Sequence, residues 1–311
     1  HIQRFFVKNF KLSQEITSIL IAIKFFFNHK NFDVIQVHQG HFLAAIIAFV
    51  CFLLKKSCFI TIANSGKKFD LLILKNKCYG SLFLKLLLIS KPSFISITKQ
   101  IKTELQNFGI DTKKIYEIPN GVEVQKINSV NSIARLKKNN ISFIGRIEPV
   151  KRPDLVVNLS TKFLNGINFN IYGGGTLLKH MKELCQSKKV NNCKVHGPVA
   201  NISEVLSNTS VLILPSTTEG MSNSILEALA AGIPILATDI PQNRFLLGEN
   251  SYTPAGILVK SESLEEWESA LNSILDQKNY VRYSENTSKI VIDYDIKHTS
   301  SLYINTYGRK K

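Results

Sequence analysis

Two glutamates, Glu219 and Glu227, lie eight residues apart in the stretch PSTTEGMSNSILEALAAG (215–232), in a chain with only 23 Asp and Glu against 39 Lys and Arg. Ser222 favours a helix N-cap and Gly232 a helix end, so we expect a short helix between them. A rise of 1.5 Å per residue places Glu227 roughly 8 Å beyond the cap, with Glu219 before it. One carboxylate could accept hydrogen bonds from ribose hydroxyls and the other from sugar hydroxyls, while amides of the first turn face a phosphate. The alternative is a surface loop followed by a solvated helix.

Two cations, Arg146 and Lys151, lie five residues apart after the apolar run 141–144. A guanidinium fork and an ammonium are suited to holding a diphosphate, and each charged hydrogen bond contributes about 1.5–3 kcal/mol. Lys151 is adjacent to Arg152, so the pattern does not decide which of the two points inward. An ordinary cationic loop is the alternative interpretation.

Three consecutive glycines, Gly173, Gly174 and Gly175, follow another apolar run and precede a helical pattern. This position is typical of a loop that approaches a nucleotide. However, Leu178 occupies the place where G-x-G-x-x-G requires its last glycine. On its own, the pattern therefore favours a tight strand-to-helix turn.

Short apolar runs alternate with helical patterns along the chain, which is the rhythm of a parallel α/β sheet. In the first half we expect strands at 33–38, 58–63 and 93–98 and helices at 42–54 and 78–90. In the second half we expect strands at 141–147, 169–173, 193–197, 210–216, 233–239 and 256–259 and helices at 153–164, 176–186, 201–206 and 264–276. A capping box from Ser263 to Glu266 would begin the last helix.

The polar segment 127–140 is the best candidate for a linker between two Rossmann-like units with a cleft between them. Such sheets bind ligands at the carboxyl ends of their strands. The loops that carry Arg146, the glycines and Glu219 all leave strands at that end, so we expect them to converge on one edge of the second sheet.

Composition is that of a globular protein, because 311 residues with 44% hydrophobic residues suit two domains. The five cysteines are odd in number and form no C-x-x-C pair, which favours a reducing cytoplasm without a disulfide or metal framework. The apolar runs are shorter than the ~18 residues of a spanning helix. Residues 1–120 hold 17 Lys and Arg against 6 Asp and Glu, a balance of +11, while residues 121–311 hold 22 against 17, a balance of +5. The basic first half could meet an anionic membrane, nucleic acid or an acidic substrate, or could be a solvated surface.

The combination of GRIEPVK (145–151), YGGG (172–175), HGPVANISEVL (196–206) and PSTTEGMSNSILEALAAGIPILATDI (215–240), with IPNGV (118–122) before them, resembles the retaining glycosyltransferases of family four. The resemblance covers about residues 93–260, in order and at the family's spacing. It implies a GT-B fold, an α/β architecture of two Rossmann-like domains facing across a cleft. The expected domains are an acceptor-side domain at 1–125, a nucleotide-sugar-binding domain at 126–281, and a helical segment at 282–311 that packs back on the first.

The activity implied by this resemblance is transfer of a sugar from a nucleoside diphosphate donor, most commonly UDP, with retained anomeric configuration and no obligatory metal. The acceptor would be a saccharide or lipid-linked saccharide in cell-surface polysaccharide synthesis. Arg146 and Lys151 would stabilise the leaving diphosphate, Glu219 would hold the donor sugar, and Glu227 would bind the ribose. The donor site would also include Gly145, Gly173, Gly174, Gly175, Gly220, Met221, Ser222 and Asn223.

The sequence departs from the family pattern in its first domain. Nothing before residue 33 supplies the family's first strand and glycine-rich loop, and the chain opens at His1, so we expect that it lacks its true start. Where the family often has a histidine, this chain has Asn64, which could orient sugar hydroxyls instead. His38 closes an earlier strand and is either a catalyst or an ordinary sheet-end histidine. The DYD motif at 293–295 is interpreted as a helix boundary rather than a metal ligand set.

Two other functions stay open at this point. A GT-B sugar-nucleotide epimerase or glycosyl phosphorylase would keep the fold and change the chemistry. A basic nucleic-acid-binding protein would explain the charge, but no ribonucleoprotein or helix-turn-helix motif is evident, so we expect no nucleic-acid partner. The expected location is the cytoplasm, with possible peripheral binding to the inner face of the membrane.

Overall fold

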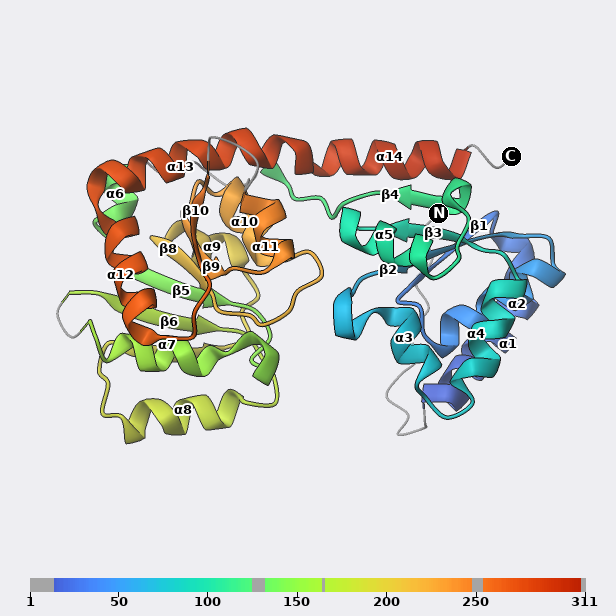
Figure 1. The fold of residues 1–311 in the computed structure, drawn as a ribbon, viewed down its shortest axis with the longest axis horizontal. Coiled ribbons are helices and arrows are strands. Elements are labelled where there is room, and N and C mark those ends of the chain that lie inside the picture. Colours follow the sequence, from blue (N-terminus) through green and yellow to red (C-terminus); the bar gives the residue numbers. More distant parts are fainter. Residues whose placement is uncertain (1–13, 125–131, 164–165, 248–253, 309–311) are drawn as a thin grey trace. The chain divides into compact units, whose positions relative to one another are not determined.

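The computed structural model describes residues 14–124, 132–163, 166–247 and 254–308. The chain divides into two compact units, the first formed by His1–Pro119 with Ser301–Lys311 and the second by Asn120–Ser300 (Figure 1). Both units contain a parallel sheet covered by helices, as the alternation of patterns predicts.

The first unit has a four-stranded parallel sheet in the order β1-β2-β3-β4. Its strands are β1 (Val34–His38), β2 (Ser57–Ile62), β3 (Ser93–Ser96) and β4 (Ile115–Glu117). Helices α2 (Phe42–Leu53) and α4 (Gly80–Ile89) pack against each other, α1 (Gln14–Asn28) packs on α2, and α3 (Asp70–Lys75) packs on α4. Helix α5 (Lys99–Asn107) contacts β3 and β4. Strands β2 and β3 are buried on both faces, which explains why they appear as continuous apolar runs.

The chain's last helix, α14 (Ile296–Gly308), completes the core of the first unit. Leu302, Tyr303 and Tyr307 pack on a buried cluster of Phe59, Ile95 and Ile118. The Tyr307 hydroxyl also donates to Gln36 Oε1 at 2.5 Å. The end of the chain therefore belongs to the unit that its beginning forms.

The preceding helix, α13 (Gln277–Val291), belongs to the second unit instead. The buried Tyr280 hydroxyl donates to the Ser210 carbonyl at 2.7 Å. The boundaries between the two units therefore lie between residues 119 and 120 and between residues 300 and 301. We expected them between 125 and 126 and between 281 and 282. The DYD motif forms a helix boundary, as predicted, because Asp295 Oδ1 accepts the Lys297 amide at 2.7 Å where α14 begins.

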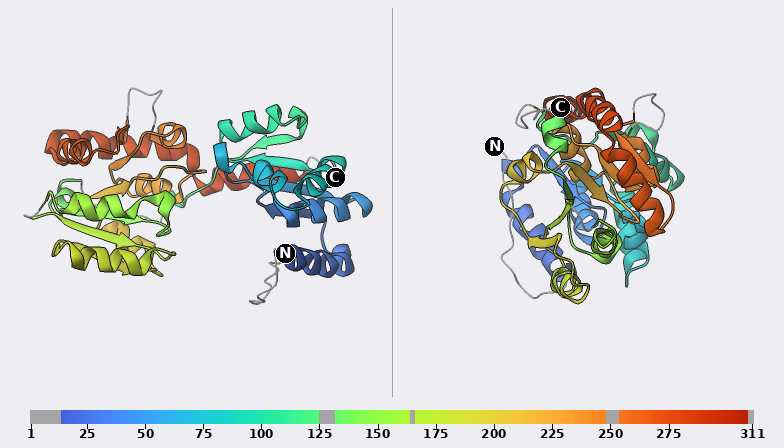
Figure 2. Two further views of the ribbon diagram at one scale, coloured as in Figure 1. Left: turned by 60° about the horizontal axis from the view of Figure 1, so that its bottom comes forward. Right: turned by 90° about the vertical axis from the view of Figure 1, so that its left-hand side faces the viewer.

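The second unit has a six-stranded parallel sheet in the order β10-β9-β8-β5-β6-β7. Its strands are β5 (Asn140–Ile144), β6 (Asn168–Tyr172), β7 (Cys193–Gly197), β8 (Val211–Leu214), β9 (Ile235–Thr238) and β10 (Gly256–Val259). Its remaining helices are α6 (Ser132–Leu136), α7 (Pro153–Ser160), α8 (Leu178–Ser187), α9 (Ile202–Ser207), α10 (Asn223–Ala230), α11 (Pro241–Leu247) and α12 (Leu264–Leu275). Helices α7 and α8 cover one face and α10 and α11 the other (Figure 2). The strand order reverses between β5 and β8, which is the topological switch point of a doubly wound sheet.

The predicted linker at 127–140 is wrong for the part that the structure describes. Residues 125–131 lie outside the described residues, but Ser132–Leu136 form α6 and Asn140 begins β5. Arg135 is fully buried, and its Nη1 donates to the carbonyls of Leu206 at 3.0 Å and Thr209 at 3.4 Å. Burial lowers the pKa of this guanidinium. One of the polar residues of this segment is therefore a buried cation that donates to carbonyls at and just beyond the end of α9.

The predicted strands all appear with small shifts of their ends, while β4, α1, α3, α5 and α11 were not among the predicted elements. The capping box at Ser263 is not formed, because its hydroxyl donates to Glu265 Oε2 at 2.7 Å and caps no amide of α12.

All five cysteines are present as thiols. Within the described residues, no helix has both the length and the apolar character needed to cross a bilayer.

Candidate functional site

Three loops of the second unit leave neighbouring strands at the same edge of the sheet. They follow β8, β5 and β6, which are adjacent in the sheet order, and comprise residues 215–222, 145–152 and 173–177. Parallel strands bring their carboxyl ends to one edge, and two of these loops flank the switch point between β5 and β8. The sequence predicts that these three loops meet at one edge of the second sheet, and the strand order places them there (Figure 1).

Lys151 and Glu219 meet at the switch point. The Lys151 Nζ donates to Glu219 Oε1 at 2.6 Å and to Oε2 at 2.5 Å, and the side chains are only 15% and 6% exposed. The Thr217 amide donates to the Val150 carbonyl at 2.9 Å, which ties the two loops together beside the ion pair. Two residues that we predicted separately as a phosphate ligand and a sugar ligand are thus one charged pair.

The backbone at Arg152 decides which of two adjacent cations faces Glu219. Arg152 is in the left-handed conformation, with φ of 48°, and it is the N-cap of α7. Its Nη1 pairs with Glu262 at 2.9 Å, a carboxylate whose side chain is 78% exposed. Lys151 is therefore the inward cation, and the question that the sequence left open is answered.

Arg146 lies at the exposed rim of the same loop, beside Glu148. Glu148 accepts the Thr176 amide at 3.1 Å and the Thr176 hydroxyl at 2.7 Å. These hydrogen bonds, with a smaller contribution from Arg146, lower the pKa of Glu148. Glu148 therefore joins the loop after β5 to the loop after β6 and stays ionised beside the guanidinium.

The glycines after β6 are explained by the contact between these loops. A Cβ added at Gly173, whose φ is 142°, would lie 1.8 Å from the Gly145 carbonyl oxygen. A Cβ at Gly175, whose φ is 154°, would lie 2.4 Å from the Ile147 carbonyl oxygen. The Ile147 amide donates to the Gly174 carbonyl at 2.8 Å. Close backbone packing in the turn between β6 and α8 accounts for Gly173 and Gly175 without a ligand.

Helix α10 begins where the sequence predicts it. Ser222 is the N-cap, and its Oγ accepts the Ile225 amide at 3.4 Å. Gly220 and Met221 complete the turn from Glu219, with Met221 buried. The helix N-terminus thus follows directly on the Lys151–Glu219 pair, and its amides add positive potential there.

A pocket of about 260 Å³ lies along α10. It is lined by Gly121, Val122, Glu123, Ile202, Ser203, Asn223, Leu226 and Glu227. Burial raises the pKa of Glu227 above its ordinary value. The pocket joins α10 to the IPNGV and NISEVL segments, which are far apart in sequence and had no predicted contact.

Asn120 fixes one wall of this pocket, and the sequence did not single it out. Its Nδ2 donates to Asn223 Oδ1 at 2.9 Å and to the Met221 carbonyl at 3.5 Å. These bonds hold the chain before Gly121 against the start of α10. The sequence feature that could have pointed to Asn120 is its position before Gly121 in the Asn-Gly pair of IPNGV. Among the described residues, the lining of the pocket includes Glu227 but neither Arg146 nor the Lys151–Glu219 pair.

In the first unit, the two possible site residues have different surroundings. His38 ends β1 with an exposed side chain. The Asn64 Nδ2 donates to Asp70 Oδ1 at 2.8 Å, and Asp70 Oδ2 accepts the amides of Gly40 and Ala63, each at 3.2 Å. Asp70 is fully buried and joins the loops after β1 and β2. The sequence showed Asp70 only as an acid before an apolar run, so this role was missed.

The family model described as glycosyl transferases group 1 matches residues 125–290. This chain belongs to that family. The match spans the loops of the second unit and α10, where the charged pair and the pocket lie. Glycosyl transferases of this group therefore share with this chain the half that carries the candidate donor site.

Individual relatives match more distantly. The chain is 31% identical over 207 residues to an Escherichia coli UDP-Gal:alpha-D-GlcNAc-diphosphoundecaprenol alpha-1,3-galactosyltransferase. The aligned region covers 60% of this chain and 52% of that protein. It is 28% identical over 203 residues to the Escherichia coli O-antigen biosynthesis glycosyltransferase WbnH, which covers 65% of this chain and 55% of that protein. The chain thus spans about half the length of these curated relatives.

The fold matches solved structures over nearly the whole chain. Anabaena HepE, in complex with UDP and glucose, superimposes with a TM-score of 0.78 at 15% identity and covers 93% of this chain and 82% of that chain. The chain therefore has the α/β fold with parallel sheets of GT-B glycosyltransferases.

Proposed function

We propose that this chain carries the donor site of a retaining glycosyltransferase that takes its sugar from a UDP-sugar. The observation that carries the proposal is the contact between Lys151 and Glu219 at the sheet's switch point, directly before the N-terminus of α10. Family membership and the likeness to HepE, which was solved with UDP and glucose, support it.

The chemistry of the site suits departure of a diphosphate. Arg146, Lys151 and the amides of Gly220, Met221 and Ser222 supply the positive charge that stabilises the phosphate oxygen as the bond to the sugar breaks. The Glu219 carboxylate, which holds Lys151 in place, would accept hydrogen bonds from the sugar hydroxyls. Because side chains and a helix terminus supply this charge, the reaction would need no metal ion.

The pocket along α10 suits the nucleoside end of the donor. Glu227, on the helix that follows the phosphate-facing amides, would accept hydrogen bonds from the ribose hydroxyls as a carboxylate. Residues Gly121–Glu123 and Ile202–Ser203 would contact the base. For the acceptor we infer a saccharide or lipid-linked saccharide of a cell-surface polysaccharide. The names of the diphosphoundecaprenol galactosyltransferase and WbnH support this choice.

Titration calorimetry and thermal unfolding with UDP, ADP and a panel of UDP-sugars test the donor assignment. A nucleotide present at 100 times its Kd stabilises the fold by about 2.7 kcal/mol, which raises Tm measurably. Arg146→Ala should weaken UDP binding about tenfold or more, because it removes a charged hydrogen bond. The matched control is Arg152→Ala, whose guanidinium pairs with exposed Glu262 and should matter little.

If no nucleotide raises Tm, or if the two arginine variants weaken binding equally, the donor site is assigned wrongly. NMR of the product made with a lipid-linked or soluble saccharide acceptor tests the rest of the proposal. Retained anomeric configuration in a new glycosidic bond supports transfer. An epimerised sugar nucleotide or a sugar phosphate would instead show an epimerase or phosphorylase.

A further inference from the structure

Helix α1 has two apolar faces, and in the part of the chain that the structure describes only one of them packs against another helix. Ala22 and Phe25 are buried where the helix packs on α2. Ile16, Ile19, Leu20, Ile23, Phe26 and Phe27 form the opposite face, at i, i+3, i+4, i+7, i+10 and i+11, and are 46–79% exposed. A helix that is apolar on both faces is stable only where something covers the second.

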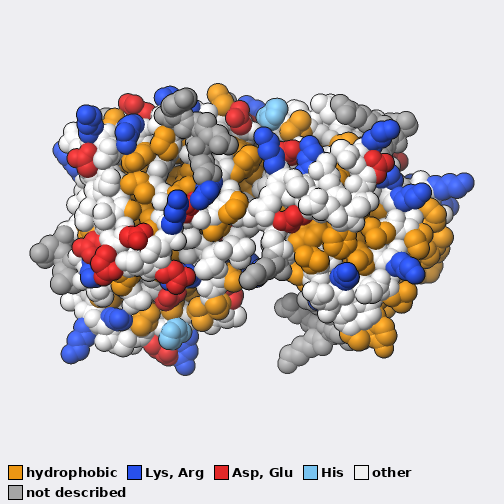
Figure 3. Space-filling view, viewed as in Figure 1, with side chains coloured by type: hydrophobic (Ala, Val, Ile, Leu, Met, Phe, Trp, Pro, Cys, Tyr) orange, Lys and Arg blue, Asp and Glu red, His pale blue; other side chains and the backbone are white. Residues whose placement is uncertain are grey.

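The neighbouring helices of the first unit also expose large hydrophobic side chains. Phe52 and Leu53 at the end of α2, and Leu82, Leu88 and Ile89 on α4, are exposed as well. Thirteen of the nineteen large hydrophobic side chains that are exposed in the described residues lie between 16 and 89. Figure 3 shows hydrophobic side chains gathered over the first unit with lysines among and around them. Such a concentration marks an interaction surface rather than scattered exposure.

Positive charge predominates in this part of the chain. Residues 16–91 contain ten lysines and only two acids, Asp33 and Asp70. Asp70 is fully buried, so Asp33 is the one acid in that range that reaches the surface. Lys24, at the side of the open face of α1, and Lys85, on α4, are both exposed. Any partner of this surface must accept cations next to hydrophobic side chains.

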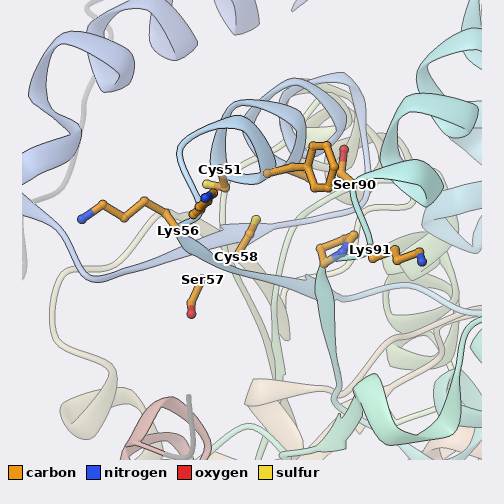
Figure 4. A pocket seen from close by; sticks show the side chains of 10 residues that line it. Cys51, Lys56, Ser57, Cys58, Ser90 and Lys91 are labelled. Carbon is orange, nitrogen blue, oxygen red and sulfur yellow. The ribbon is translucent and has the colours of Figure 1, made fainter. Parts of the chain in front are cut away.

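More lysines gather where α2 and α4 end. A hollow of about 350 Å³ there is lined by Ala48, Cys51, Phe52, Lys55, Lys56, Ser57, Cys58, Ser90, Lys91 and Pro92. In Figure 4 the side chains of Lys56 and Lys91 extend away from Cys51 and Cys58 in opposite directions. Lys56 Nζ donates to the Phe32 carbonyl at 2.8 Å, and Lys114 Nζ donates to the Lys91 carbonyl.

These cations form a rim rather than an anion pocket. The carboxyl ends of two helices point toward the hollow, and their partial negative charge disfavours an anion inside it. Burial, and next the charge of Lys91, lower the pKa of Lys114, so these two ammonium groups repel each other. Negative charge placed outside the rim would reduce this repulsion.

We propose that the open face of α1, with Phe52, Leu53, Leu82, Leu88 and Ile89 and the lysines around them, binds the surface of an anionic phospholipid bilayer. Apolar side chains would enter the acyl boundary while lysines reach the phosphates, as in interfacial amphipathic helices. This lysine–apolar surface belongs to the first unit. It can therefore be tested separately from the donor site in the second.

The composition of the surface favours a bilayer over a protein. A second copy of the chain would bring the same lysines against each other, and like charges oppose such a contact. A folded partner that covered the hydrophobic side chains would also have to desolvate the ammonium groups or offer an acid for each. A bilayer lets each lysine stay hydrated at the level of its phosphates.

Flotation of the full chain with vesicles tests the proposal. Vesicles of phosphatidylcholine mixed with phosphatidylglycerol should carry the protein at low salt and release it at high salt, whereas pure phosphatidylcholine should bind it weakly. Lys24→Glu with Lys85→Glu should lower affinity by at least about fivefold per lysine. The matched control is Lys179→Glu on α8 of the second unit, whose side chain is 91% exposed.

A second pair of variants tests the apolar contribution. Ile19→Ser with Ile23→Ser should abolish flotation, while Ile304→Ser, which is 69% exposed on α14, should not. Far-ultraviolet circular dichroism and UDP binding report whether each variant is folded, and UDP affinity should be unchanged in all of them. Equal binding to neutral vesicles, or equal effects of the control variants, would overturn the proposal. So would a stable dimer in analytical ultracentrifugation that the serine pair dissociates.

Discussion

Replacing Lys151 by methionine removes the ammonium that both Glu219 oxygens accept from, at 2.6 and 2.5 Å, and leaves the carboxylate without it. Loss of one partner costs about 3–5 kcal/mol for a fully buried pair and about 0–1 kcal/mol for an exposed one. The side chains are 15% and 6% exposed, so the cost should lie between these limits, at about 2 kcal/mol. In a unit of this size that lowers Tm by roughly 4–8 °C.

Variants of the two partners should differ in UDP binding. This difference distinguishes a role in the donor site from a role in the fold alone. Lys151→Met should weaken UDP about tenfold or more in titration calorimetry, because a charged contact to the diphosphate is lost. Glu219→Gln should bind UDP as well as the unmodified chain or more tightly, since the ammonium is no longer neutralised, yet should lose sugar transfer. Arg152→Met should change neither property. A parallel loss of UDP binding in Lys151→Met and Glu219→Gln would show that the pair only supports the fold.

The remaining predictions concern the glycines, the pocket and metal dependence. Gly173→Ala should lower Tm strongly, because its Cβ would lie 1.8 Å from the Gly145 carbonyl oxygen, while Gly174→Ala, 3.2 Å from a proline Cγ, should be nearly neutral in the same melts. Burial raises the pKa of Glu227, so its ionised form costs folding free energy at neutral pH, and this cost fades as pH falls through the folded-state pKa. Glu227→Gln should therefore raise Tm at neutral pH and lose that advantage below the ordinary glutamate pKa of 4.5, whereas the UDP affinity of the unmodified chain should fall over the same descent. Asn120→Ala should raise the Kd for UDP several-fold with little change in Tm, since it releases one wall of the pocket. Chelation with EDTA should leave UDP binding unchanged in calorimetry, and a loss restored by magnesium would contradict the metal-free mechanism.

Every described strand except β4 could be predicted, and β2, β3 and β8 appear as continuous apolar runs because they are buried on both faces. The edge at which the loops meet followed from the same rule, since a loop after a strand always leaves at the carboxyl end. The contact between Lys151 and Glu219 could not be predicted, because it depends on β5 and β8 being neighbours in the sheet although the chain forms β6 and β7 between them. Only the strand order supplies that information.

Two of the errors share a physical source, which is that polarity was taken to mean exposure. Arg135 contributes to the polarity that made the segment 127–140 resemble a linker, but its guanidinium is buried and its Nη1 donates to the carbonyls of Leu206 and Thr209. Asp70 was overlooked for a similar reason, because its carboxylate is buried against amides of two loops. In the opposite direction, the apolar run of α1 did not show that half of its side chains lie on an open face.

The glycines after β6 show why a motif and its mechanism must be argued separately. Gly173 and Gly175 meet the backbone at Gly145 and Ile147, which immediately flank Arg146. Any side chain there would push this loop away from β6 and carry the guanidinium with it. The same contact continues to Glu148, which accepts from Thr176, and so to the turn that presents Lys151. We therefore expect these glycines to influence diphosphate binding through the placement of Arg146 and Lys151, so a glycine variant should weaken UDP binding even where it touches no atom of the nucleotide.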